Sequence, residues 1–560
     1  MRRFIMMMAI VVLTTCIWAQ TEIEENTAQD SLKIENVIID TLEERIDPKL
    51  LLDEMNNFLD EKKKSEDDFF LPHLIYQENF HLSSPFNLNM RITKNGFSEI
   101  PFATENLQTV QNNRNIFKTI YKRGNIFYNS WEYSLPAALT ETYMGLGDNN
   151  MNNIAVSLMK GSIFGIPKLD MQLDYLGEKG IWQGYEDEVI QNFHLHLIYN
   201  LNFARIHFDN NIIDQSLPSG KDIYENLGYM YPNFSASNKE NVYSIKIENN
   251  IVDIGLKYKY NNYKIENFFR KERNLTQVLV KKKFAMQNHQ LDLSYEFISE
   301  DIVINSYSNS IINDRSNSYH IFSADQDSNI FGFNIGNTGF FRDNNNYKLD
   351  SNLKKKIFHG FSLCGELNAS STEFYPNVNS NNLLNQIRSG IGGGLSLDLS
   401  HIRTKIIMGQ HQYEDFIGNY FDMHSKLFLN FTKNINIKLD QWLRNEQTNF
   451  RTELNTEIIS FPEWQMSNLL EIKYLLKYNN AIKLGLRHIY HSNYSYYLDG
   501  CESPFTSHTQ NFDAYLKIQL TNNFEISVDA VNLTNNKIMF TNYNHPGTHF
   551  NFNVHWIFMN

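Results

Sequence analysis

The sequence predicts an all-β chain that closes into a transmembrane antiparallel β-barrel of about 18–22 strands, preceded by a short disordered or helical N-terminal extension. Three observations favour this fold. Apolar and polar residues alternate along many runs of about 9–12 residues, long enough to cross a bilayer at a tilt. Short turns and long polar loops alternate between these runs. Aromatic residues make up 14% of the chain, as expected for a barrel with aromatic belts at both membrane interfaces.

Residues 1–19 are predicted to be a secretory signal peptide. Two arginines follow the first methionine, an apolar stretch comes next, and the small residue Ala19 stands before the expected cut. A lipoprotein signal ending at Cys16 is the alternative. It is disfavoured because Thr15 is bulky for the position before a lipidated cysteine. The mature chain is therefore expected to leave the cytoplasm of a Gram-negative bacterium.

Residues 20–68 are predicted to form an acidic periplasmic tail, mostly disordered. They hold 16 acidic and 6 basic residues, so most of the formal net charge of −13 lies in this stretch. One helix is expected at residues 47–64, where Asp47 can cap and Pro48 suits the first turn. It is either an amphipathic spacer or a docking element for a periplasmic partner. Residues 69–115 are expected to be a transition segment or a vestigial plug.

Residues 116–560 are predicted to form the barrel. The composition is uniform and contains no Pro/Gly/Ser-rich linker, so one closed sheet explains it better than several domains. Only Cys364 and Cys501 remain once the signal is removed, and two unpaired thiols are expected rather than a disulfide framework. No basic stripe points to nucleic acid as a partner. Clear alternating runs occur at residues 169–175, 193–201, 252–260 and 291–297.

Hairpins are clearest in the second half of the chain. Three pairs of runs meet at residues 432–434, 479–480 and 521–523, where Asn can take the left-handed conformation of a tight turn. A secreted soluble sandwich or propeller is less favoured, because sandwich strands average about 5–6 residues and no blade repeat is visible. Longer polar loops are expected at residues 210–240, 299–317, 370–389 and 491–510.

The last run of the chain carries a specific signal. Its apolar face consists of Phe550, Phe552, Val554, Trp556 and Phe558. An alternating terminal strand that ends in an aromatic residue resembles the barrel-closing strand of outer-membrane proteins, although two further residues follow the aromatic here. The resemblance implies a barrel in the cell outer membrane, in contact with lipid. It also implies the barrel-insertion machinery as a partner.

The stretch before that run narrows the resemblance. A run at 524–531 leads into a turn and then to a restart of the chain before the last strand. The turn is formed by Asn532, Leu533, Thr534 and Asn535, and the restart by Pro546 and Gly547. This pattern resembles the closing hairpin of TonB-dependent receptor barrels. The family also has a large plug domain, whereas only residues 20–115 precede the predicted barrel. We therefore expect a plugless relative, acting as a passive pore or a binding barrel.

No catalytic, cofactor or metal site is predicted, and an enzyme is not expected. Zinc-protease, P-loop, serine-elbow and paired CxxC motifs are lacking. His194 and His196 share one face of a run; they are expected to be wall residues rather than metal ligands, since no third ligand is evident. The glycines at 390–394 are expected to relieve barrel curvature. Residues 148–153 have calcium-loop composition but lack the required Gly and Glu, so an ordinary loop is expected.

The polar faces of the runs predict a lumen lined by both signs of charge, which does not favour a strongly ion-selective pore. We therefore expect a barrel that admits or binds a small polar solute of unknown identity. A structural or adhesive barrel with long surface loops and a passive general porin are the alternatives. The inward residues are expected to include Asp170, Asp174, His194, His196, Lys257, Lys259, Asp292, Glu296, Lys438, Lys473, Lys483, Arg487, Lys517 and Asn553.

Overall fold

The structure is a computed structural model of the 560-residue chain, which divides into two compact units, residues 1–61 and 62–560. In the first unit, residues 53–58 are helical, inside the helix expected at 47–64. Among the described residues, no helix has the length and apolar character needed to cross a membrane. The predicted signal peptide and Cys501 lie outside the described residues. Those are 53–58, 91–93, 98–99, 117–122, 125–147, 152–179, 189–217, 236–265, 269–306, 312–342, 346–358, 360–374, 384–413, 416–447, 463–477, 480–496, 505–520, 523–534, 539–540, 543–544 and 548–559.

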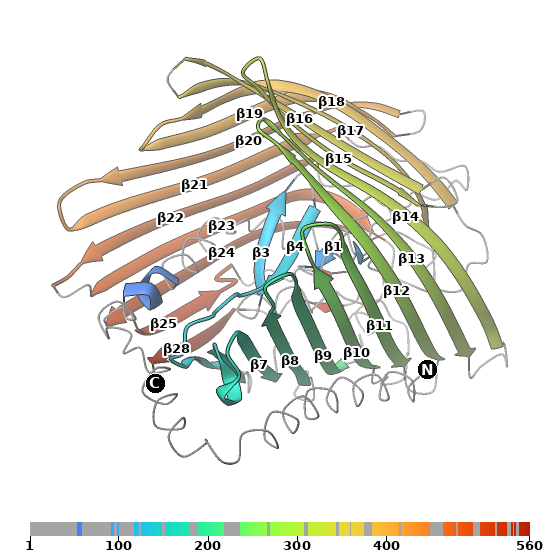
Figure 1. Ribbon diagram of the computed structural model, residues 1–560. Coiled ribbons are helices and arrows are strands. Elements are labelled where there is room, and N and C mark those ends of the chain that lie inside the picture. The colour runs from blue at the N-terminus through green and yellow to red at the C-terminus, as the bar shows by residue number, and fades with distance from the viewer. Residues whose placement is uncertain are drawn as a thin grey trace, which may run out of the picture. The chain divides into compact units, whose positions relative to one another are not determined.

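The second unit contains a closed barrel of 22 antiparallel strands (Figure 1). Consecutive strands pair around the sheet, and β28 closes it by pairing with β25 on one side and β5 on the other. The predicted all-β barrel and its strand number are confirmed. The strands are β5 Leu139–Gly147, β6 Asn152–Lys160, β7 Leu169–Lys179, β8 Val189–Asn200, β9 Arg205–Leu217, β10 Ala236–Glu248, β11 Asp253–Ile265, β12 Phe269–Met286, β13 His289–Ser306, β14 Ile312–Ile330, β15 Phe333–Arg342, β16 Asn346–Phe358, β17 Phe361–Phe374, β18 Leu384–Asp398, β19 Ile402–Tyr413, β20 Phe416–Asn430, β21 Ile435–Glu446, β22 Trp464–Leu475, β23 Ala481–Tyr496, β24 Phe505–Leu520, β25 Phe524–Val531 and β28 His549–Met559.

The barrel begins later than the sequence predicts. Four short strands before it form a separate sheet in the order β2-β1-β4-β3, in which β1 and β4 run parallel. Residues from 116 onward are expected to belong to the barrel, but β3 and β4 lie outside it and are only six residues each. Such strands are too short to cross a hydrocarbon layer of about 25 Å. The four strands are β1 Arg91–Thr93, β2 Ser98–Glu99, β3 Phe117–Lys122 and β4 Asn125–Ser130; a further pair, β26 Met539–Phe540 and β27 Tyr543–Asn544, forms its own sheet.

The described turns at one end of the barrel are short, for example residues 287–288 and 331–332, and this end is periplasmic in barrels of this kind. At the other end of the barrel, the prediction of a loop at residues 299–317 is wrong for most of these residues. β13 continues to Ser306 and β14 begins at Ile312. The alternation fades there because apolar residues such as Ile298 and Ile302 are buried on the inner face, while Asp301 is exposed on the outer face. The strands likewise continue into the other three predicted loops.

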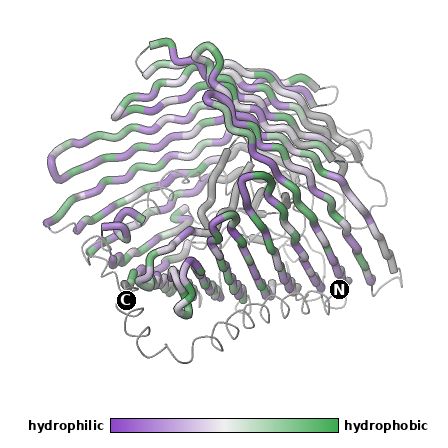
Figure 2. The backbone as a smooth tube through the Cα atoms, in the orientation of Figure 1, coloured by the Kyte–Doolittle hydropathy of each residue, from purple (hydrophilic) through white to green (hydrophobic). Residues whose placement is uncertain are grey.

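The strand register places large apolar side chains on the outer face of the barrel and polar side chains on the inner face. On the outer face, large apolar side chains such as Leu256 and Leu486 are each 45% exposed, whereas inward Lys257 is only 2% exposed. Figure 2 shows the alternation of hydrophilic and hydrophobic residues along the strands. All the residues expected to face the lumen occupy inner-face positions in the register. Exposed apolar area costs about 25 cal/mol per Å² in water, so the outer face is covered by lipid and the protein is an outer-membrane β-barrel.

Aromatic side chains stand at the tips of two periplasmic turns. Phe331, in the turn between β14 and β15, has φ 52° and is 93% exposed, and Phe164, between β6 and β7, has φ 55°. A left-handed conformation costs a non-glycine residue about 1–2 kcal/mol. Nearby, the Lys355 ammonium lies 4.1 Å from the centre of the Phe333 ring. Exposed rings and snorkelling lysines of this kind suit the membrane–water interface.

Tyrosines crossing over glycines shape the inner wall. The hydroxyl of Tyr420 on β20 donates to Glu366 on β17, at 2.6 Å, and the ring crosses Gly409 and Gly392 to reach it. Tyr515 on β24 crosses Gly485 in the same way and donates to Glu471, also at 2.6 Å. A Cβ on Gly392, Gly409 or Gly485 would overlap the tyrosine side chain that crosses it. Gly392, in the glycine run at 390–394, thus leaves room for the hydrogen bond between Tyr420 and Glu366 on the inner face of the barrel.

Replacing Gly392 by alanine is expected to destabilise the barrel by about 1–3 kcal/mol, the usual cost of overpacking. The added Cβ would overlap the Tyr420 hydroxyl and approach Ile407. The measurement is urea unfolding in detergent micelles, followed by heat-modifiable gel mobility. Gly393→Ala is the matched control, because its Cβ faces outward and meets nothing nearer than the Cys364 carbonyl at 4.0 Å. Equal losses for both variants would contradict the account.

Leu486→Arg is expected to lower the stability of the inserted barrel by about 2–4 kcal/mol, because it places a charge in the lipid-facing band. Lys483→Arg, on the inner face of the same strand, keeps the charge and is expected to leave stability unchanged. Reversible unfolding in phosphatidylcholine vesicles measures both. Tolerance of arginine at position 486 would mean that this face does not contact hydrocarbon.

Candidate functional site in the barrel lumen

The inner face of β7 to β13 forms a buried polar wall. This wall is defined by the buried side chains Asp170, Gln172, Asp174, Asn192, His194, His196, His207, Glu240, Ser244, Lys246, Asp253, Lys257, Lys259, Asn261, Arg273, Gln277, Glu296 and Glu300, together with the half-buried Asp209 and Glu248. Burying a charge without a partner is costly. The charges of this wall are therefore expected to be matched by nearby groups of opposite charge.

The first cluster links two histidines through carboxylates. Nδ1 of His194 lies 2.9 Å from Asp174 Oδ2, and its Nε2 lies 3.5 Å from Asp209 Oδ1. Nδ1 of His196 lies 2.5 Å from the same Asp209 oxygen. A ring nitrogen facing a carboxylate must donate, so two such contacts suit a doubly protonated His194. Asp209 is the centre of this cluster because it serves both rings.

The second cluster continues the wall onto β10 and β11. His207 Nε2 lies 3.3 Å from Glu248, whose other oxygen lies 2.5 Å from the Lys246 ammonium. Lys246 also lies 3.8 Å from Asp253 across the β10–β11 pair. The His196 and His207 rings are 5.7 Å apart, so the two clusters adjoin. The alternation of cation and anion lets these charges stay out of water.

Further along the wall, ion pairs and hydrogen bonds join neighbouring strands. The Lys259 ammonium lies 2.8 Å from Glu240, and the Asn261 amide also points at that carboxylate, at 3.5 Å. On β12 and β13, Arg273 pairs with Glu300. The Gln277 amide donates to Glu296 in the same strand pair. Each pair bridges neighbouring strands, so the wall stiffens the sheet as well as lining the lumen.

Sequence reasoning placed His194, His196 and Asp174 on the wall but missed Asp209 and His207. Asp209 and His207 lie on β9, where they alternate with Ile206 and Phe208, and this pattern could have revealed an inward face. The segment was partly assigned to a loop beginning at residue 210. Within the part of the chain that the structure describes, no group of three or more His, Cys, Asp or Glu side chains is arranged to hold a metal ion.

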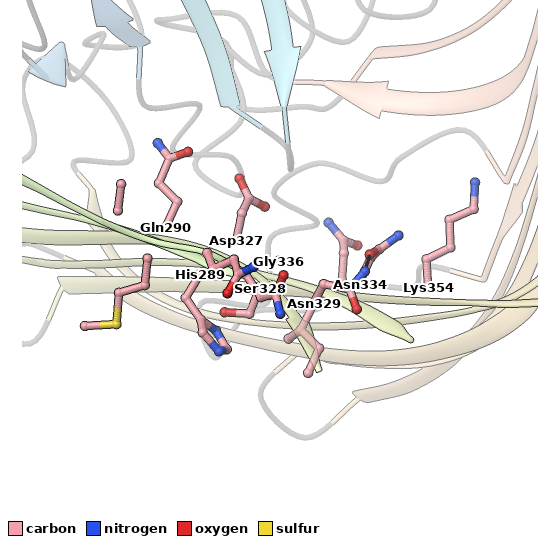
Figure 3. A pocket seen from close by; sticks show the side chains of 14 residues that line it. His289, Gln290, Asp327, Ser328, Asn329, Asn334, Gly336 and Lys354 are labelled. Atoms are coloured by element: carbon pink, nitrogen blue, oxygen red, sulfur yellow. Dashed lines mark hydrogen bonds between the residues drawn. The ribbon is translucent and has the colours of Figure 1, made fainter. Parts of the chain in front are cut away.

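The inner face of β15 to β25 is more open. The Lys405 side chain is 52% exposed and only 4.0 Å from Glu366, and Arg487 lies 3.7 Å from Asp513. Between the β12–β13 and β14–β15 turns there is an open cavity of 570 Å³. The side chains of Gln290, Asp327 and Lys354 project from one side of the strands, and that of His289 from the other side (Figure 3). Lys405 and Lys354 are thus exposed charged groups on this half of the wall, which also holds buried charges such as Asp440 and Glu446.

The segment that leads into β5 is fastened to the periplasmic rim. Glu132 forms an ion pair with Arg205 at 3.1 Å, and the Gly161 N–H donates to the Leu135 carbonyl at 2.8 Å. The buried Tyr133 hydroxyl donates to the Ala137 carbonyl at 2.8 Å, and burial raises the pKa of Tyr133 to about 12. The chain therefore enters the barrel in a fixed position.

The residues singled out at the end of the sequence lie on β28 and in the turn after β25. Phe550, Phe552 and Trp556 are exposed on the outer face, while Val554 and Phe558 are half-buried there. Asn532 is fully buried with φ 54°, and its N–H donates to Asp513 Oδ1 at 2.8 Å. Leu533 N–H donates to the Phe512 carbonyl, and the Thr534 hydroxyl to the Gln510 carbonyl. Asn535, Pro546 and Gly547 lie outside the described residues.

No family model matches the sequence, and no curated protein matches it. Solved structures match the fold. The siderophore receptor PirA from Acinetobacter baumannii superposes with a TM-score of 0.59 at 10% identity, covering 78% of this chain and 82% of that one. The alcaligin outer-membrane receptor FauA from Bordetella pertussis gives 0.59 at 8% identity, with 85% and 87% covered. The ferric enterobactin receptor PfeA from Pseudomonas aeruginosa gives 0.59 at 9%, with 80% and 86% covered.

The protein has the barrel fold of the TonB-dependent receptors. At these identities the likeness concerns the fold alone and does not extend to the side chains that line the lumen. The resemblance inferred from the last hairpin of the sequence is confirmed at the level of the barrel.

Asp209→Asn is expected to destabilise the barrel by about 3 kcal/mol, because it leaves two buried histidines without their shared carboxylate. Asp214→Asn on the same strand is the matched control. Its pair with Lys239 is half-exposed, and such pairs contribute at most about 1 kcal/mol. Urea unfolding in micelles compares the two. If Asp209→Asn proved as mild as Asp214→Asn, the cluster would not be held by this carboxylate.

Proposed function

We propose that this protein is an outer-membrane receptor or passage barrel for a small polar solute. The observation that carries the proposal is the lumen itself. One half of the wall is a rigid network of matched charges, and the other half presents accessible charged groups such as Lys405 and Lys354. A wall of this kind can hydrogen-bond a polar solute at many points, whereas a purely structural barrel has no need of accessible charges.

The first solute class to test is an iron chelate, since the solved barrels of this fold described above are siderophore receptors. We further assign residues 1–19 as the signal peptide and residues 20–68 as a periplasmic tail that can meet a partner. The β28 strand is assigned as the segment that the barrel-insertion machinery recognises. We propose no enzymatic activity.

The test is uptake of radiolabelled iron, supplied as a panel of siderophore complexes, by a Gram-negative strain that lacks its own receptors. We expect the full-length chain to raise uptake of at least one complex above that of the empty vector. Lys405→Glu is expected to change this uptake by about fivefold, because a charge at about 4 Å contributes about 1 kcal/mol in water. The direction of the change gives the sign of the solute's charge.

Lys239→Glu is the matched control for this experiment. Lys239 is also exposed and makes a single ion pair, but it faces outward near the opposite end of the barrel. Its reversal is expected to leave uptake unchanged. Channel conductance without solute preference would identify the protein as a passive porin rather than a receptor. Correct insertion with neither uptake nor conductance would leave a structural or adhesive barrel, and either result overturns the proposal.

A further inference from the structure

A row of polar side chains crosses three strands on the outer face of the barrel. Ser351 on β16 donates its hydroxyl to Asn337 on β15 at 2.6 Å, and the Asn337 amide donates to Gln326 on β14 at 3.2 Å. The Gln326 amide in turn donates to Ser328 at 2.9 Å. Gln326, Asn337 and Ser351 are half-buried and directly opposite one another in the register. We call these three residues the polar row.

The apolar neighbours of the polar row show that it faces lipid. Side chains alternate between the two faces of a strand, so positions two or four apart share a face. Phe322 and Phe341, directly opposite each other on the extracellular side of the row, are 55% and 50% exposed. Ile330 and Leu353, on its periplasmic side, are 37% and 40% exposed. The row is therefore enclosed by outward side chains that suit hydrocarbon.

The depth of the polar row follows from its distance along the strands to the periplasmic turns. Gln326 is five residues before Phe331 in the β14–β15 turn. A strand rises about 3.4 Å per residue and tilts by about 40° in barrels of this kind, so the row lies about 13 Å above the turn. The apolar band is about 25 Å tall. The row is thus near mid-depth, where lipid chains offer no hydrogen-bond partner.

A similar pair of outward amides lies at a different depth. The Gln410 amide on β19 donates to Asn419 on β20 at 3.2 Å. Asn419 is twelve residues before Phe431 in the β20–β21 turn, which places it about 31 Å above that turn. At that height, water and lipid headgroups can solvate an amide. The polar row holds amides at a depth that headgroups do not reach, so a partner for the row has to be another protein surface within the membrane.

We propose that the polar row and the outward side chains around it form an interface with a second copy of this chain. A two-fold axis along the membrane normal places every residue at the same depth in both copies, so the two rows meet. An amide has two N–H donors and two acceptor lone pairs, so the row can pair with its own image. Ala324 and Gly339, directly opposite each other between the row and the two phenylalanines, let the two backbones approach closely. The inference goes beyond the proposed function and does not rest on it.

Sedimentation equilibrium of the full-length protein in density-matched detergent micelles measures the self-association. We expect the wild type to form a reversible dimer. Gln326→Leu is expected to weaken the dimer about tenfold, because a two-fold interface loses the amide twice. The same substitution is expected not to lower the unfolding midpoint in urea, since leucine suits a lipid-facing position.

Asn419→Leu is the matched control, since it also removes an outward amide that is bonded to a neighbouring strand. It is expected to leave dimerisation unchanged. The proposal is overturned if the wild type is monomeric at every concentration or if both substitutions weaken the dimer equally. It is also overturned if Gln326→Leu lowers the urea midpoint while the dimer persists, which would identify a tie within one sheet.

Ala324→Cys tests the same interface in intact cells. A residue near a two-fold axis meets its own image, so a membrane-permeant oxidant is expected to link two copies by a disulfide, above the level seen with the wild type. Ser425→Cys is the control, because Ser425 also faces outward and is only six residues before Phe431, at a similar depth on β20. Equal linkage of both variants, or linkage of position 324 to a different protein, would contradict the proposal.

Discussion

The structure depends on one constraint, that hydrocarbon offers no hydrogen-bond partner to a peptide group. Every strand in the membrane must therefore be paired on both sides, and a sheet can meet this demand only by closing. The decisive contact is the pairing of β28 with β5, which joins the end of the chain to residues more than four hundred positions earlier. Once this pairing exists, each strand has a lipid face and a lumen face, and the alternation of residues decides what each face contains.

Closure fixes the register, and the register decides how charges in the lumen are matched. Asp209 serves His194 and His196 because β8 and β9 place these positions on adjacent strands of one face. The tyrosine ties have the same origin: Tyr420 reaches Glu366 only because two glycines lie beneath its path. Rigidity and polarity thus come from the same side chains.

The sequence was informative wherever the signal was local. The sequence pattern predicted the barrel, the inward position of Lys257 and Lys483, and the turn at 432–434. The prediction failed where a strand does not alternate between apolar outward and polar inward residues. β3 and β4 do not belong to the barrel, and the β13–β14 hairpin carries buried apolar residues such as Ile298 and Ile302 on its inner face. Partners such as Asp209 for His194 depend on strand register, which a single sequence does not specify.

These facts explain how barrels at about 10% identity share a fold. The membrane requires only that outward positions be apolar, that strands be long enough, and that the sheet close. Many sequences satisfy these demands, so the fold carries little information about the solute. The inner face is free of the lipid requirement, and an arrangement that costs stability there needs a separate reason.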